Sequence, residues 1–350
     1  MTSFGIAYTD PGVPNGVAYA KAGHLLDLTD AIEQYGWDER FAIATNQGWW
    51  WEHWTPGQIF GLPYDMTTVG VYYNKAMLDE LGLPVPQTFE EFQTLLATLK
   101  EQKPDVAPIS VGVGYGWPTA HLFDQITHST VPYEELKKIV LYDPEGNWNQ
   151  PGFIEAGQIL QDWYQKGYFE DNLLATGDED ALNLFLQGKS ALYIGGAWHN
   201  GQLKDAPFEV HFFGIPPVHP DINPDGAWHY GGYTVNNSWI VNKDTPYQEQ
   251  ALELVDHMLS KDSAIALWEG MGDLVAYTFA EGEAPTPVFP FQKEIYDLMH
   301  KAQTGFYVDI PSYYGEQWGA YQALVSGEKT PEETVQALQE LYQRAVSEQE

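Results

Sequence analysis

Strand and helix signals alternate along this chain, and this alternation limits its fold more than any other feature of the sequence. Val69, Val71 and Tyr73 recur at the two-residue period of a half-buried strand. Thr88 and Glu91 then have the spacing of a capping box, which opens a helix. The apolar face of that helix consists of Phe89, Phe92, Leu95, Leu96 and Leu99. Repeated alternation of this kind predicts a layered α/β architecture with helices packed on sheets.

Further segments extend the alternation. Short apolar runs predict buried strands at 107–112 and 191–194. Helices are predicted from Trp117-Pro118 onward and over 152–166, 179–187, 247–259 and 262–270. Thr330 and Glu333 repeat the capping-box spacing and open the final helix. Residues 141–148 have the composition of a hairpin turn, and residues 216–227 that of a loop.

The charge of the chain excludes one large class of function. The sequence holds 49 acidic and 16 basic residues, a net charge of −33. Such a charge repels nucleic-acid phosphates and anionic lipid surfaces, so we expect no nucleic-acid partner. The acidity fits a salty or acidic habitat, colloidal solubility or attraction for cations, and composition does not separate these.

The length and the cysteine content of the chain limit its domain number and the kinds of site that it can contain. A chain of 350 residues exceeds the size to which one hydrophobic core usually grows, so two domains are expected. The absence of cysteine excludes disulfides, thiolate metal sites and thiol nucleophiles. No segment approaches the roughly 20 apolar residues of a membrane helix, and the first residues lack the pattern of an export signal.

Motifs for metal, nucleotide or catalytic chemistry are missing from the sequence. The ten histidines show neither His-x-x-x-His nor His-Glu-x-x-His spacing. No Gly-x-Ser-x-Gly elbow occurs, and the glycines at 112, 114 and 116 depart from the dinucleotide fingerprint. We therefore expect no metal, no cofactor and no catalytic residues.

Two stretches carry a family resemblance. The first runs through Gly61–Asp65, Val71–Lys75, Leu81–Pro84 and Pro86–Phe92, and the second is Gly188–Trp198. In this order they resemble the extracellular solute-binding proteins of ABC importers, specifically the carbohydrate-binding family that includes maltose-binding protein. The resemblance implies a receptor that closes around a sugar and presents it to a membrane permease, outside the cell or in the periplasm.

The resemblance also implies a fold and a domain organisation. It implies an α/β, two-lobed periplasmic-binding-protein-like fold of type II, with discontinuous lobes joined by a hinge. The expected lobes are 1–66 with 235–284 and 67–234 with 285–350, with hinges near 66–69, 232–236 and 283–287. Members normally carry a signal sequence and a first strand, helix and strand ahead of Phe4, so the first lobe is expected to be incomplete. A monomer is the family default.

Sugar recognition needs flat aromatic faces for the apolar side of a pyranose and planar polar groups for its hydroxyls. The chain supplies 13 Trp and 22 Tyr. Trp198 follows a strand and a Gly-Gly turn, and the resemblance implies that it stacks on the sugar. Trp117, with Tyr115 and His121, matches a segment that lines the family's cleft. Core packing remains the alternative for each aromatic residue.

The remaining candidates are placed by the resemblance in loops and at the hinges. They are Tyr8 and Asp10 after the first strand, Tyr64, Asp65 and Thr67 at the first crossing, Gly232 and Tyr233 at the second, and Tyr313 and Tyr314 in the last second-lobe segment. Asp65 can equally be a solvated turn residue, and the glycines can serve the hinge alone. Within Trp49–Trp51 at least one ring should be exposed, and Trp50 is a candidate platform.

Two other functions stay open from the residues. A glycoside hydrolase or lyase would need two carboxylates flanking a scissile bond, and 49 acidic residues allow such a pair. The same fold could also bind a polyamine, a glycerophosphodiester or a metal complex. The scarcity of Lys and Arg near the candidate residues disfavours a phosphate ligand. The leading hypothesis is a carbohydrate receptor without turnover.

Overall fold

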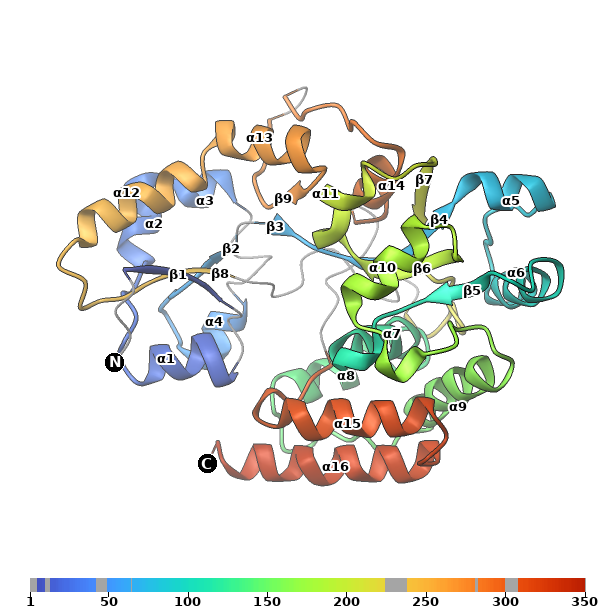
Figure 1. Cartoon of the computed structure of the whole chain (residues 1–350). Helices are drawn as coiled ribbons and strands as arrows, with labels where there is room; N and C mark the ends of the chain where they lie inside the picture. The colour runs from blue at the N-terminus through green and yellow to red at the C-terminus, as the bar shows by residue number, and fades with distance from the viewer. Residues whose placement is uncertain are drawn as a thin grey trace. The chain divides into compact units, whose positions relative to one another are not determined.

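The structure is a computed structural model that describes residues 5–9, 13–41, 49–63, 65–223, 238–280, 283–299 and 308–349 (Figure 1). The chain forms two compact units, each built from two separate stretches of sequence. The first unit is Met1–Thr67 with Tyr233–Gln292, and the second is Thr68–Gly232 with Lys293–Glu350. The third crossing therefore falls inside helix α14 (Pro290–Met299), later in the chain than the expected 284/285.

The first unit holds two small sheets. Its elements are β1 (Ile6–Thr9), η1 (Val13–Val17), α1 (Ala18–Lys21), α2 (Thr29–Tyr35), α3 (Trp37–Arg40), α4 (Trp49–Trp54), β2 (Leu62–Pro63), β3 (Asp65–Met66), β8 (Ser238–Val241), α12 (Gln248–Met258), α13 (Lys261–Met271), β9 (Leu274–Val275) and the start of α14. The larger sheet has the order β1-β8-β2, and β3 pairs with β9. Both pairings in the larger sheet are antiparallel, with Trp239 opposite Tyr8 on one side and Leu62 on the other.

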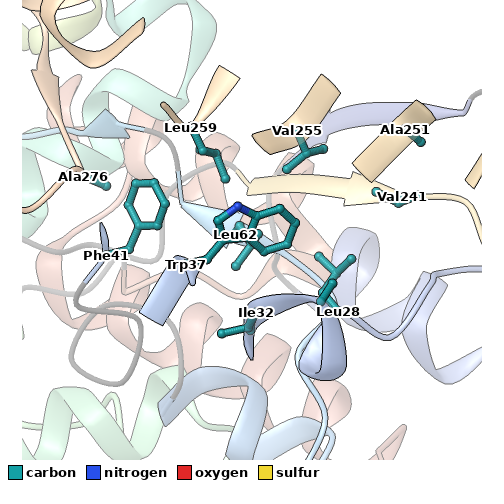
Figure 2. Close-up of a cluster of buried hydrophobic side chains, with 11 residues drawn as sticks. Leu28, Ile32, Trp37, Phe41, Leu62, Val241, Ala251, Val255, Leu259 and Ala276 are labelled. Carbon is teal, nitrogen blue, oxygen red and sulfur yellow. The ribbon is translucent and has the colours of Figure 1, made fainter. Parts of the chain in front are cut away.

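A hydrophobic cluster fills the space between this sheet and helices α2, α3 and α12 (Figure 2). Trp37 lies at its centre with no exposed surface. Its indole Nε1 donates to Asp256 Oδ1 of α12 at 3.0 Å, and Arg40 pairs with the same oxygen at 2.8 Å. The polar edge of the indole is thus satisfied while its rings are buried, which anchors α3 to α12.

The second unit is built on a four-stranded sheet of order β5-β6-β4-β7. Its elements are β4 (Val69–Asn74), α5 (Lys75–Leu81), α6 (Phe89–Gln102), β5 (Ala107–Ser110), η3 (Val113–Tyr115), α7 (Trp117–Thr127), α8 (Tyr133–Val140), α9 (Pro151–Gln165), η4 (Leu173–Ala175), α10 (Asp178–Leu186), β6 (Ser190–Gly196), η5 (Ala197–His199), α11 (Asn200–Leu203), β7 (Val210–Phe213), η6 (Pro311–Tyr313), α15 (Tyr314–Val325), α16 (Pro331–Ser347) and the end of α14. Strands β5 and β6 are parallel, whereas β4 runs antiparallel to β6 and β7.

Helices cover both faces of this sheet. Tyr72 and Tyr193 share one face, and the ring of Phe185 in α10 lies 6.1 Å from that of Tyr193. Phe213 points to the opposite face, where its ring centroid lies 6.0 Å from that of Phe92 in α6. Helices α15 and α16 lie side by side and pack on α9 (Figure 1). Every residue of β4 is buried, so the strand expected from Val69, Val71 and Tyr73 is present, but the expectation that it is only half-buried is wrong.

Of the local structures predicted from the sequence, both capping boxes are present and the hairpin turn is not. Both capping boxes form: the side chain of Thr88 accepts from Glu91 N at 3.2 Å, and that of Thr330 accepts from Glu333 N at 3.1 Å. The hairpin turn expected at 141–148 is wrong, because this segment joins helices α8 and α9. Its composition specifies a reversal of chain direction but not the elements that flank it.

Candidate functional site

The parallel pair β5 and β6 brings two candidate segments of the second unit together. The carboxyl ends of parallel strands lie at one edge of a sheet. Beyond β5, the chain passes through η3 into α7, which begins at Trp117. Beyond β6 it passes directly into η5, which contains Trp198. The two indoles meet edge to face, with ring centroids 5.4 Å apart and an interplanar angle of 65°.

His121 joins the two indoles from one helical turn further along α7. Its ring lies 5.3 Å from Trp117 and 5.8 Å from Trp198. Burial lowers the pKa of His121 to about 3, so the imidazole is neutral near pH 7. A neutral imidazole keeps both a donor and an acceptor for hydrogen bonding. We call Trp117, His121 and Trp198 the aromatic group.

Tyr115 lies in η3, just ahead of the aromatic group, and at 54% it is the most exposed of the candidate aromatics that the structure describes. Its ring packs on Gly177, where an added Cβ would lie 2.8 Å from Tyr115 Cζ. Glycine at 177 therefore makes room for the tyrosine ring. Trp198 is 36% exposed. The second unit thus presents two accessible aromatic surfaces at the edge of its sheet.

Trp198 is held on both its flat and its polar side. An added Cβ at Gly196 would lie 2.0 Å from Trp198 Cζ3, so the indole folds back against the Gly-Gly turn. The indole Nε1 donates to Asp178 Oδ2 at 3.2 Å. Asp178 is the first residue of α10 and only 3% exposed.

Asp178 is itself part of a buried polar cluster. The Tyr193 hydroxyl donates to Asp178 Oδ1 at 3.0 Å and lies 2.7 Å from His199 Nδ1, while His199 Nε2 lies 3.6 Å from Asp178 Oδ2. Burial raises the pKa of Asp178, and the nearby His199 opposes that rise. Burial lowers the pKa of His199, and Asp178 opposes this in turn.

A second aromatic pair comes from α15. The rings of Tyr314 and Trp318 stack at 4.9 Å, one helical turn apart. An added Cβ at Gly116 would lie 2.6 Å from Trp318 Cβ, so α15 packs directly beside the residue that precedes Trp117. Tyr314 was among the candidates predicted from the sequence, but Trp318 was not. The i, i+4 spacing of the two residues on one helix is the signal that could have found it.

The family comparison agrees with the geometry. The model of the bacterial extracellular solute-binding protein family matches residues 6–265. The chain belongs to this family. The resemblance stated from the sequence is confirmed.

Individual relatives of this solute-binding protein are distant in sequence. The maltodextrin-binding protein MdxE of Bacillus subtilis (strain 168) is 24% identical over 266 residues, which are 75% of this chain and 58% of the relative. A relative from Brucella abortus (strain 2308) is 23% identical over 275 residues, which are 72% of this chain and 64% of its own length. The match therefore spans less than two thirds of the length of these relatives.

Among solved structures, a chitin oligosaccharide binding protein superposes with a TM-score of 0.83 at 23% identity. The superposition covers 98% of this chain and 83% of that protein. At this level of identity the likeness shows the fold, and the expected α/β fold of type II periplasmic-binding proteins is confirmed.

The candidate site residues in the first unit of the solute-binding protein differ in their exposure to solvent. Tyr8 is 37% exposed, and its ring lies 4.9 Å from that of Trp239 on the neighbouring strand. Thr67 is buried, and Asp65 lies in β3 opposite Val275. Trp50 is only 4% exposed and packs edge-on against Trp54, which does not fit an exposed platform. Asp10, Tyr64, Gly232 and Tyr233 lie outside the described residues.

Tyr313, the neighbour of Tyr314, is buried in a structural contact. Its hydroxyl donates to Glu348 and Arg344 lies over its ring at 4.3 Å, which ties η6 to the end of α16. In the part of the chain that the structure describes, no group of three or more His, Cys, Asp or Glu side chains could hold a metal ion. No described helix has the length and apolar character needed to cross a membrane.

The low pKa of His121 predicts an acid-dependent loss of stability. Because burial lowers the folded-state pKa to about 3, the unfolded chain binds more protons between pH 6.5 and about 3. This contribution to stability is complete above pH 6.5 and is lost as the pH falls. As the pH falls from about 7 to 4, we expect the melting temperature of His121→Gln to fall less steeply than that of the wild type. Differential scanning calorimetry at a series of pH values measures both slopes.

His257→Gln is the matched control, because His257 is an exposed histidine of α12 and lies outside the aromatic group. Burial raises the pKa of Glu170 to about 7, and burial also raises the pKa of Asp178. These two carboxyl groups add stability as the pH falls, which is the opposite of the effect of His121. The comparison is therefore the difference between variant and wild type at each pH. Equal slopes for His121→Gln and the wild type would contradict the assignment of a neutral, desolvated imidazole.

Proposed function

We propose that this solute-binding protein is a carbohydrate receptor that delivers a sugar, in the first instance an oligosaccharide, to the permease of an ABC importer. The observation that carries the proposal is the aromatic group with Tyr115, because these rings lie together at one edge of the sheet and two of them are accessible. Aromatic faces cover the apolar side of a pyranose, and the neutral His121 supplies hydrogen bonds to hydroxyls.

The relatives support the same class of ligand. One is named for maltodextrin and a structural neighbour for chitin oligosaccharides, both of which are chains of pyranose rings. From the family we also propose that the protein works outside the cytoplasm and as a monomer. The described candidate rings do not specify which sugar is bound, because stacking on an indole accepts any ring with an apolar face.

We propose that binding occurs without turnover. Glycoside hydrolysis needs two carboxylates that can reach the same bond. Asp178 is a carboxylate in contact with the aromatic group, and its two oxygens accept hydrogen bonds from Trp198 and Tyr193. A carboxylate engaged in this way is held as a structural acceptor and is not presented to a glycosidic oxygen.

Thermal unfolding with a ligand panel tests the function. The panel contains maltodextrins, chitin oligosaccharides, raffinose and their monosaccharides, with spermidine as a non-sugar arm. A ligand at 100 times its dissociation constant adds about 2.7 kcal/mol to the free energy of unfolding, so the melting temperature should rise by several degrees with one class of sugar. A rise with spermidine alone would overturn the carbohydrate assignment. A sugar product appearing over hours of incubation would overturn the absence of turnover.

A further inference from the structure

We propose that Asp178 is the positioning residue of the binding surface: it fixes the plane of the Trp198 indole through the Nε1 hydrogen bond and does not itself contact the sugar. The inference rests on the proposed function, in which Trp198 stacks on a pyranose. It assigns a role to a buried residue that was not among the sequence-based candidates and that lies 20 positions before Trp198 in the sequence.

The first step of the argument is the freedom that Trp198 would otherwise have. The residue lies in a three-residue turn, η5, and is 36% exposed, so packing restrains only part of its side chain. Gly196 packs against the face of the six-membered ring. The Nε1–H···Oδ2 bond to Asp178 restrains the polar edge of the five-membered ring. A contact on the face together with a hydrogen bond at the edge restricts both tilt and rotation of the indole, whereas the face contact alone leaves the ring free to turn in its own plane.

The second step is the rigidity of Asp178. It is 3% exposed, begins helix α10 and accepts the Tyr193 hydroxyl on its other oxygen. The Tyr193 hydroxyl oxygen also lies 2.7 Å from His199 Nδ1, and the imidazole tautomer sets which of the two atoms donates. Tyr193 lies in β6 and His199 in η5, so helix, strand and turn are joined at one carboxylate.

The third step concerns binding. A ring that already has its bound orientation loses less conformational entropy when a ligand docks, so fixing the indole raises affinity without adding a contact. A side chain whose rotamer is locked by a supporting hydrogen bond is the general form of such a site. Because both oxygens of Asp178 accept hydrogen bonds within the protein, we expect it to affect sugar affinity through the orientation of Trp198. Removal of the Asp178 side chain should therefore change the orientation of the indole even without sugar.

The test compares Asp178→Ala and Asp178→Asn with the wild type, using the indole N–H signals in a nitrogen-15 correlation spectrum of the full chain. Trp198→Phe identifies the Trp198 signal by its loss. In the sugar-free wild type we expect this proton to be shifted downfield and slow to exchange with water, because it is bonded to a buried carboxylate. Asp178→Ala should remove both properties, and Asp178→Asn should restore part of them, since the amide oxygen can still accept.

The second readout is the dissociation constant for the sugar identified in the thermal panel. We expect Asp178→Ala to bind about tenfold more weakly, which corresponds to about 1.4 kcal/mol. In a Trp198→Phe background, where the indole N–H is absent, the same substitution should change affinity less than about twofold, because the two residues act as one unit. Asp180→Asn is the matched control: it removes one charge from the same first turn of α10, where Asp180 is exposed.

The outcomes separate the two proposals. An unchanged Trp198 signal in Asp178→Ala overturns the positioning role, and so does an equal loss of affinity in both backgrounds, because Asp178 would then act on the sugar directly. If Asp178→Ala fails to fold, the spectra of Asp178→Asn decide the question. If the wild type binds no sugar, the proposed function fails, while the sugar-free spectra still show whether Asp178 fixes the indole.

Discussion

Trp37→Ala should destabilise the first unit by about 3–5 kcal/mol, the range found when a fully buried aromatic side chain is truncated. Trp37 has no exposed surface and lies at the centre of the cluster between the sheet and α12 (Figure 2). Its removal leaves a cavity and deprives Asp256 of the indole donor. Hydrogen exchange of peptides from α2 and α12 measures the effect within this unit, because a chain of two units need not unfold in one step.

The controls separate cavity formation from loss of the hydrogen bond. Trp37→Phe keeps most of the buried ring but lacks the Nε1 donor, so we expect about half the loss or less. Leu254→Ala removes a side chain of α12 that is half exposed and should change the free energy of unfolding by no more than about 0.5 kcal/mol. A change below about 1 kcal/mol for Trp37→Ala would show that the cluster is not the stabilising core of this unit.

Trp198→Ala should weaken sugar binding about thirtyfold or more. Binding hot spots are enriched in tryptophan, and truncation of such a residue costs at least about 2 kcal/mol, where 1.4 kcal/mol is a tenfold change. Trp198 is both partly exposed and anchored, the combination that a stacking surface requires. Isothermal titration calorimetry with the sugar from the thermal panel measures the loss.

Trp198→Phe retains a flat ring and should bind more tightly than Trp198→Ala, although it lacks the Nε1 donor. Tyr164→Ala is the matched control, because Tyr164 is an exposed aromatic residue of α9 in the same unit. It belongs neither to the aromatic group nor to the Tyr314–Trp318 pair. Equal affinity of wild type and Trp198→Ala would remove the stacking interaction from the proposed site while leaving the fold untouched.

The sequence predicted those features whose partners are close along the chain. A capping box needs only Thr88 and Glu91, three positions apart, and the structure has both of its hydrogen bonds. The glycines after α9 and α10 adopt positive φ values, 66° at Gly167 and 69° at Gly188, as a helix end prefers. Trp117 and Trp198 were each named through the family resemblance, whereas their edge-to-face contact comes from the structure, in which β5 and β6 are parallel.

Features that depend on distant partners escaped prediction. Nothing near Asp178 in the sequence shows that its carboxylate accepts from Trp198 and Tyr193, because the contact needs α10 and β6 to be packed together. The Trp49–Trp51 run reads as a surface by its composition, yet Trp50 and Trp51 are buried. Burial is decided by what packs on a segment, and local composition carries little information on that.

The pairing of β1 with β8 has a consequence for biosynthesis. Tyr8 lies opposite Trp239, and among the described strands β1 pairs with β8 alone, which the ribosome makes only after the whole sheet of the second unit, β4 to β7. At about 5–20 residues per second, the interval between β1 and β8 lasts on the order of ten seconds or more. During that time β1 lacks the strand that it pairs with in the described structure, and the apolar face of α2 lacks α12, while the sheet of the second unit is synthesised.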